Sequence, residues 1–205
     1  MVKALFYADD MAVLAPSIKG LEFLLKICGD YCLEWDICLN AKKSRCLYFG
    51  KTTTVSHTII LNGKPLEWTS EWVYLGVTLK SGKIFGCSVK DRIRKFYRCA
   101  NAIFRIDGVS NDIIMLRLVE SHCVPILTYA SEIIHVANRD DRRQLRVAYN
   151  SLFRKIFGYR RWESVTALQG FLNRPTWEQL VERRRLSFVN RLQSSNDGTL
   201  ARALI

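Results

Sequence analysis

LFYADDMAVL, at residues 5–14, is the stretch that decides the fold. Two short apolar runs flank the turn formed by Ala8, Asp9 and Asp10, an arrangement typical of two strands joined in a tight hairpin. An Asp-Asp pair by itself says little about function. The chain has a second pair at Asp140 and Asp141, where acids at the start of a helix favour the helix dipole. The apolar strands on both sides distinguish the first pair.

The two hairpin carboxylates predict a divalent cation. Asp9 and Asp10 oppose each other's ionisation when they are buried this close together without a compensating charge. Magnesium resolves the conflict, because it binds hard carboxylate oxygens together with the phosphates of a substrate. The small side chain of Ala8 leaves room beside such metals for the end of a nucleic acid.

The first 80 residues predict an α+β unit. Ser17 is positioned as the N-cap of a helix. Residues 45–49 return as a strand, and Asn62-Gly63 is the strongest short signal for a second hairpin. One more strand is expected over residues 72–79, closed by turn residues. The apolar stripe of the helix follows the 3.6-residue period and consists of Leu21, Leu24, Leu25, Cys28, Cys32 and Trp35.

From about residue 82 the apolar pattern becomes helical. One helix is expected over residues 89–104, and a second begins near Asn111 and is kinked or restarted by Pro125. A third helix is expected over residues 140–157, and a last long helix follows Pro175. We therefore expect two domains, an α+β domain at residues 1–82 and an all-helical domain at residues 83–205.

The charge of the chain is concentrated in its helical part. The net charge is +12, of which residues 1–80 carry +1 and residues 81–205 carry +11. Such a bias predicts contact with a polyanion, although solvated basic helices are an alternative. The arginines fall on one face of each of two predicted helices. The first set is Arg94, Arg98 and Arg105, and the second is Arg139, Arg142, Arg143 and Arg146.

Composition points to an intracellular protein, in the nucleus or the cytoplasm, that is neither secreted nor membrane-bound. No apolar run approaches the roughly 20 residues that a membrane span requires, and no secretory signal opens the chain. The seven cysteines include no C-x-x-C pair, so we expect them to act as small core hydrophobes rather than as zinc ligands.

Three motifs, in this order and spacing, resemble those of the reverse transcriptases of non-LTR, jockey-like retrotransposons. Residues 6–12 resemble motif C, the F/Y-x-D-D hairpin, and residues 39–44, LNAKKS, resemble the N-x-x-K segment called motif D. Residues 74–77, YLGV, resemble the Y-L-G signature near motif E. A weaker, compositional match to the thumb covers residues 120–129. The resemblance implies the C-terminal part of a polymerase palm, with antiparallel strands and one long helix, followed by a helical, thumb-like domain.

Carried onto this sequence, the resemblance implies an RNA-directed DNA polymerase site. Asp9 would bind the catalytic Mg²⁺ (or Mn²⁺) ions and Asp10 would support them, in a two-metal transfer that activates the primer 3′-hydroxyl and stabilises pyrophosphate. Lys43 would neutralise or protonate pyrophosphate, although a solvated lysine is an equal alternative. Deoxynucleotides, an RNA template and a DNA primer would be the partners.

Further residues would contact the primer or the nucleic-acid backbone by the same resemblance. Tyr7 and Ala8 lie at the hairpin, and the motif E turn would support the primer, although burial in a strand also explains Tyr74 and Leu75. The arginine faces would neutralise phosphates along the backbone. The motif E residues are Tyr74, Leu75 and Gly76.

The chain departs from the family pattern at its N-terminal side. Motif C lies only six residues from the first residue, and no acidic residue stands in the context of motif A, which supplies a further metal-binding aspartate. The fingers and motif B are absent too. We therefore expect a fragment that binds the metal weakly and is inactive alone, with the missing N-terminal half as a possible partner. The alternative is a noncatalytic RNA- or DNA-binding relic or domesticated protein.

Overall fold

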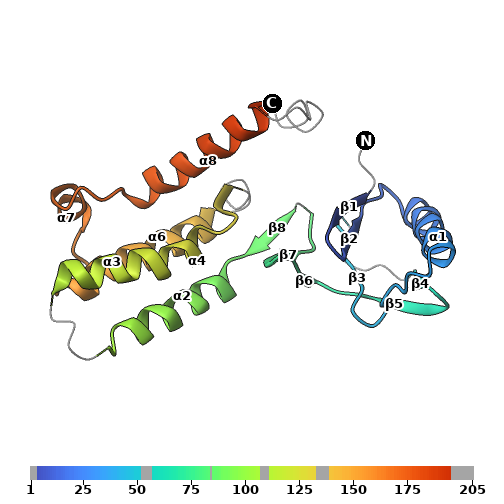
Figure 1. Cartoon of the computed structure of the whole chain (residues 1–205), viewed down its shortest axis with the longest axis horizontal. Helices are drawn as coiled ribbons and strands as arrows, with labels where there is room; N and C mark the ends of the chain where they lie inside the picture. The colour runs from blue at the N-terminus through green and yellow to red at the C-terminus, as the bar shows by residue number, and fades with distance from the viewer. Residues whose placement is uncertain (1–3, 52–56, 84, 107–110, 133–138, 195–205) are drawn as a thin grey trace. The chain divides into compact units, whose positions relative to one another are not determined.

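The computed structural model describes residues 4–51, 57–83, 85–106, 111–132 and 139–194 (Figure 1). The chain divides into two compact units, unit 1 up to Phe85 and unit 2 from Gly86. Unit 1 mixes strands with one long helix, and helices dominate unit 2, so the mixed α/β class is confirmed. The palm and thumb identities of the two units stay predictions.

Unit 1 contains seven described strands and one described helix. A tight turn follows β1, and the chain enters α1 after β2 because Ser17 Oγ accepts a hydrogen bond of 3.1 Å from Gly20 N, as expected for an N-cap. The elements are β1 (Ala4–Tyr7), β2 (Asp10–Val13), α1 (Ile18–Glu34), β3 (Arg45–Cys46), β4 (Ile59–Leu61), β5 (Lys64–Trp68), β6 (Glu71–Tyr74) and β7 (Val77–Lys80).

The two hairpins predicted from the residue pattern both form. Strands β1 and β2 pair antiparallel, with Tyr7 opposite Asp10, so Ala8 and Asp9 make the turn. Strands β4 and β5 pair antiparallel around Asn62 and Gly63, whose φ angles of 50° and 72° are those of a type I′ turn. A Cβ at Gly63 would meet no neighbouring atom, so crowding does not require glycine there. The positive φ of this residue does favour glycine.

The single strand expected over residues 72–79 is wrong, because the segment folds into a third hairpin. Strands β6 and β7 pair antiparallel with Tyr74 opposite Val77, so Leu75 and Gly76 form the turn. Their φ angles are 46° and 74°, close to those of the Asn62-Gly63 turn. Leucine gives no turn signal, so the residue pattern alone predicted one strand, whereas the resemblance to motif E implies a turn here.

The strand expected over residues 45–49 is shorter than predicted. Only Arg45 and Cys46 are in β3, and they pair parallel with Glu67 and Trp68 of β5. Unit 1 is therefore not purely antiparallel. An ion pair of 3.1 Å between Arg45 and Glu67 lies on this parallel pair.

The core of unit 1 lies between α1 and the sheet of β3, β5 and β4. Leu25 is buried on α1, as the apolar stripe predicts, whereas Trp35 at the end of that stripe is exposed. Val13 and Trp68 pack against the core and tie the first hairpin and β5 to it. The buried residues of this cluster are Leu25, Cys46, Ile59, Leu61 and Leu66.

Unit 2 is built from helices that follow one short strand. Asn111 caps α3 through its side-chain oxygen, and the chain restarts as α4 with Pro125 in the first turn, as Pro125 predicts. In Figure 1, α6 lies between α2 and α8. The elements are β8 (Gly86–Ser88), α2 (Lys90–Ile103), α3 (Asp112–His122), α4 (Val124–Thr128), α6 (Arg139–Ile156), α7 (Thr166–Phe171) and α8 (Trp177–Ser194).

The core of unit 2 forms around α6. Leu145, Tyr149 and Leu152 are buried on one face of this helix. The ring of Tyr149 lies 5.8 Å from that of Trp177 in α8, and its hydroxyl donates a 2.9 Å hydrogen bond to the carbonyl of Pro175. These contacts fix α8 on α6 and thereby set the surface between them.

All seven cysteines are free thiols, and four of them are buried. Within unit 2, Cys123 Sγ donates to Cys99 Sγ at 3.4 Å. Burial, followed by this hydrogen bond, raises the pKa of the Cys123 thiol to about 12. Among the residues that the structure describes, no helix has the length and apolar character to cross a membrane.

Candidate functional site

The Asp-Asp pair lies at the tip of the β1–β2 hairpin. Ala8 has a φ of 52°, in the left-handed region that a small residue tolerates better than a large one, and Asp9 and Asp10 are both exposed. Phe6 and Tyr7 precede them with 70% and 66% of their surface exposed. The hairpin therefore presents two carboxylates and two aromatic rings to its surroundings.

Asp9 and Asp10 are the candidate magnesium ligands of the chain. Within the described part of the chain, no group of three or more Asp, Glu, His or Cys side chains is placed to hold a metal ion. Magnesium demands near-octahedral oxygen ligation, and two exposed carboxylates supply too few protein ligands for a pair of metals. Whether the hairpin binds magnesium, and how tightly, stays a prediction.

Lys43 is held in a turn by Asn40. The side-chain oxygen of Asn40 accepts hydrogen bonds from the backbone N–H groups of Lys42 and Lys43, at 3.1 and 3.2 Å. The backbone carbonyl of Asn40 accepts from Ser44 Oγ at 2.9 Å. Asparagine suits this position because its side chain can hydrogen-bond to the backbone two residues on. Lys43 is exposed, and whether its charge meets pyrophosphate stays a prediction.

The motif E residues form the β6–β7 turn. Tyr74 and Leu75 are half-buried and Gly76 is exposed. Leu75 adopts a left-handed φ that costs an L-residue roughly 1–2 kcal/mol, so the surrounding contacts hold a strained turn. A primer contact at this turn stays a prediction.

The arginines of α2 differ in their exposure and in their ion pairs. Arg94 and Arg98 are exposed on the helix, and Arg105 is exposed just beyond its C-terminal end. Arg94 makes an ion pair of 3.2 Å with Asp91, which reduces its free charge. Arg92, which the sequence pattern did not single out, is buried, with its guanidinium 5.9 Å from the ring of Tyr129.

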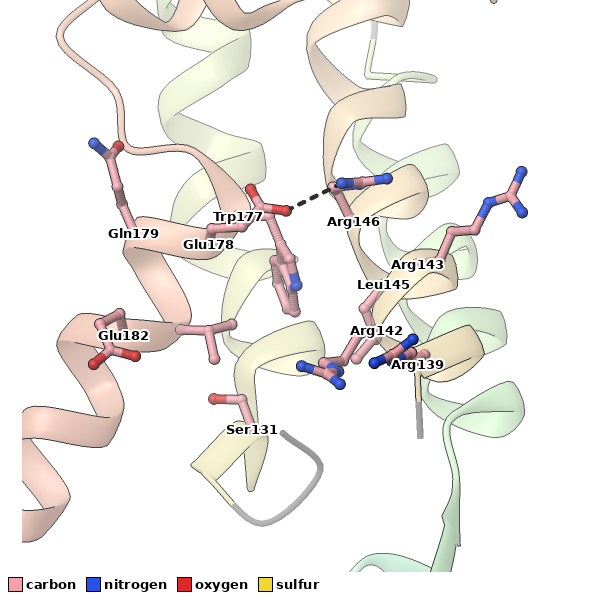
Figure 2. A pocket seen from close by; sticks show the side chains of 11 residues that line it. Ser131, Arg139, Arg142, Arg143, Leu145, Arg146, Trp177, Glu178, Gln179 and Glu182 are labelled. Atoms are coloured by element: carbon pink, nitrogen blue, oxygen red, sulfur yellow. Dashed lines mark hydrogen bonds and ion pairs between the residues drawn. The ribbon is translucent and has the colours of Figure 1, made fainter. Parts of the chain in front are cut away.

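The arginines of α6 line a cavity of about 700 Å³, called here the arginine cavity (Figure 2). Its apolar wall comes from Leu145 of α6 and from Trp177 and Val181 of α8. Figure 2 shows Arg139 and Arg142 near one end of the cavity, and Arg143 pointing away from α8. The lining arginines are Arg139, Arg142, Arg143 and Arg146.

Acidic side chains of α8 moderate the charge of the arginine cavity. Glu178 and Glu182 also line it, and Arg146 makes an ion pair of 3.5 Å with Glu178 (Figure 2). Both partners of that pair are largely exposed, so it contributes little to stability and leaves Arg146 able to exchange partners. Four arginines against two glutamates leave the cavity basic.

The structure therefore brings one set of predicted residues together. The α6 arginines share one cavity, whereas Arg94, Arg98 and Arg105 are not among the described residues that line it. Sequence reasoning missed Trp177 and Glu178. Their i, i+4 partners Val181 and Glu182 show a helical pattern that could have identified them.

Comparison with known proteins gives three relatives, all RNA-directed DNA polymerases. The chain is 28% identical over 210 residues to the probable RNA-directed DNA polymerase from transposon BS of Drosophila melanogaster. This match covers 97% of this chain and 23% of that protein. The chain is 26% identical to the enzyme from the mobile element jockey of Drosophila funebris and 23% identical to its Drosophila melanogaster counterpart, each over 74% of this chain and 18% of the relative.

The match covers only a small part of each relative. The chain spans less than a quarter of their length, with 23% as the largest share. No protein-family model and no solved structure matches it. The resemblance drawn from motifs C, D and E is confirmed: over nearly its whole length, the chain is similar to one segment of the RNA-directed DNA polymerases of non-LTR transposons.

Proposed function

We propose that the chain is a segment of an RNA-directed DNA polymerase whose helical unit 2 holds primer–template nucleic acid. The observation that carries this proposal is the basic cavity between α6 and α8, in a chain whose relatives are RNA-directed DNA polymerases. Guanidinium groups bind phosphates in bidentate fashion and keep their charge at all physiological pH values. A cluster of them on one rigid helix suits a nucleic-acid backbone, independent of base sequence.

The catalytic part of the proposal concerns the β1–β2 hairpin. Asp9 and Asp10 would hold Mg²⁺ or Mn²⁺ once a further carboxylate joins them, and the metals would supply charge stabilisation for nucleotidyl transfer. The exposed rings of Phe6 and Tyr7 offer an apolar surface on which a further part of a polymerase can pack. The proposed polymerase site also includes Lys43 and the β6–β7 turn. Its partners are an RNA template, a DNA primer and deoxynucleotides.

A noncatalytic nucleic-acid-binding protein is the second candidate. The observation that favours it is the charge distribution, since residues 81–205 carry +11 of the net charge of +12 and binding through them needs no metal. Primer extension separates the two candidates. A longer protein that contains this segment should extend a DNA primer on an RNA template and lose that activity on Asp9→Asn, whereas a noncatalytic binder shows no extension in either form.

Binding is tested on the chain itself, by fluorescence anisotropy with a labelled RNA–DNA hybrid. Replacing Arg139, Arg142 and Arg146 by glutamine should weaken binding at least tenfold, because each arginine that neutralises a phosphate releases counterions from the nucleic acid and glutamine does not. These side chains are exposed or half-buried, so the fold should survive.

The matched control removes the same charge from unit 1. Lys19, Lys26 and Lys64 are exposed there, and their replacement by glutamine should change the affinity less than twofold. An equal weakening of binding in the two triple variants would mean that net charge alone drives binding and that the arginine cavity has no special role.

A further inference from the structure

A second pocket, of about 390 Å³, lies beside the arginine cavity in unit 2 and is called here the base pocket. It adjoins the arginine cavity because Arg146 and Glu178 line both. Its volume falls at the lower end of the range for small-molecule sites, about 300–1,000 Å³. The pocket is therefore large enough for one small ring system and is continuous with a basic surface.

The wall of the base pocket carries polar groups that are already ordered. Gln169, only 1% exposed, donates from Nε2 to Asn150 Oδ1 at 3.2 Å, and both residues line the pocket. An amide group has two N–H donors and a carbonyl acceptor, so the pair carries further donors and acceptors beyond the bond that joins it. Asparagine and glutamine amides are groups that proteins use to hydrogen-bond base edges.

An exposed aromatic ring stands at the same pocket. Trp162 lines it with 78% of its surface exposed, and the guanidinium of Arg160 lies 5.8 Å from the Trp162 ring. Aromatic rings and arginine planes are the side chains on which unpaired bases stack. An indole with this much exposed surface contributes little to the stability of the fold, and its face is accessible to a partner.

Basic side chains of α6 belong to the same pocket. Arg146 and Arg154 line the base pocket, and Arg154 is oriented by a 3.0 Å hydrogen bond from its Nε to the backbone carbonyl of Glu163. The carboxylate of Glu163 accepts a hydrogen bond from the backbone of Arg160, which occupies the acid in a local turn. The pocket thus brings together an exposed aromatic ring, two side-chain amides and two guanidinium groups.

We propose that the base pocket holds one unpaired nucleobase of a nucleic-acid strand whose phosphates contact the arginines of α6. This inference rests on the proposed function. It adds a preference for unpaired over fully paired strands, which contacts to the phosphate backbone alone do not give. A fully paired duplex must unpair a base to fill the pocket, which lowers its affinity relative to a single strand.

The test compares three labelled ligands of equal length with the full chain: a single-stranded RNA, a fully paired RNA–DNA hybrid and an abasic single strand. Stacking of one base is worth roughly tenfold or more in affinity, so the parent should bind the RNA strand at least tenfold more tightly than the abasic strand. Trp162→Ala should remove most of this difference and leave the abasic strand's affinity unchanged. Trp162→Phe, which keeps a ring, should restore part of it.

Phe171 provides a matched control. It is 88% exposed, lies on α7 and is not among the described residues that line the base pocket. Phe171→Ala should leave all three affinities unchanged. The inference is overturned if Trp162→Ala and Phe171→Ala behave alike, or if the parent binds abasic and base-bearing strands equally. Salt-dependent binding without any base preference overturns the base pocket alone, whereas absence of binding to all three ligands overturns the proposed function as well.

Discussion

The β6–β7 turn offers a sharp test of the structure through Leu75→Val. If residues 72–79 were one strand, valine would be neutral or better than leucine, since β-branched residues favour strands. In the turn, Leu75 has a φ of 46°, where a β-branched side chain is strongly disfavoured. The loss of one methylene costs about 0.8 kcal/mol, and the added backbone strain should cost about 1 kcal/mol more.

The matched control for this prediction is Leu79→Val. Leu79 is half-buried like Leu75 but lies in β7 opposite Trp72, with extended backbone. It loses the same methylene without the strain, so its free energy of unfolding should fall by no more than about 1 kcal/mol. In urea titrations followed by circular dichroism, a difference of about 1 kcal/mol between the variants separates their midpoints by roughly 0.5–1 M. Equal midpoints for the two variants would refute the turn.

Three further predictions concern the hairpin acids and the buried thiol. The chain alone, with primer–template, magnesium and nucleotides, should show no extension above background, and extension that Asp9→Ala abolishes would contradict this. Calorimetric titration should detect only weak magnesium binding, and a tight site that disappears in Asp9→Asn would be inconsistent with two isolated carboxylates. The Cys123 pKa, raised from 9.0 to about 12, means that the folded state keeps a proton which the unfolded state loses above pH 9, so stability falls as pH rises from 9 towards 12. Between pH 8 and 10 the parent should lose more of its unfolding free energy than Cys123→Ala, and equal decreases would count against the buried thiol.

The sequence predicted elements whose signals are local. Ser17, with the apolar period behind it, located α1, and Asn62-Gly63 located the β4–β5 hairpin, because capping and turn preferences act within a few residues. Pro125 marked the break between α3 and α4 for the same reason. The residue pattern did not predict the Leu75-Gly76 turn, because leucine reaches a left-handed φ only when tertiary contacts hold it there; only the resemblance to motif E implied a turn.

Contacts between distant segments account for most of what sequence reasoning missed. The parallel pairing of β3 with β5 joins Arg45 to Glu67, and no short-range pattern encodes such a pairing. The arginine face of α6 was predictable from i, i+3 and i+4 spacing. Its acidic partner Glu178 lies 32 positions beyond Arg146 and becomes a neighbour only when α8 packs on α6.

The salt dependence of binding tests the central claim most directly. The logarithm of the affinity of the chain for an RNA–DNA hybrid should fall linearly with the logarithm of the salt concentration. Each phosphate that a variant no longer neutralises should make this slope shallower by about 0.9. Glutamine at Arg139, Arg142 and Arg146 should therefore flatten the slope by about 2 to 3, while the Lys19, Lys26 and Lys64 variant keeps the parent's slope. A parent slope near zero, or identical slopes for the parent and the arginine variant, would contradict the claim that unit 2 holds nucleic acid through the arginines of α6.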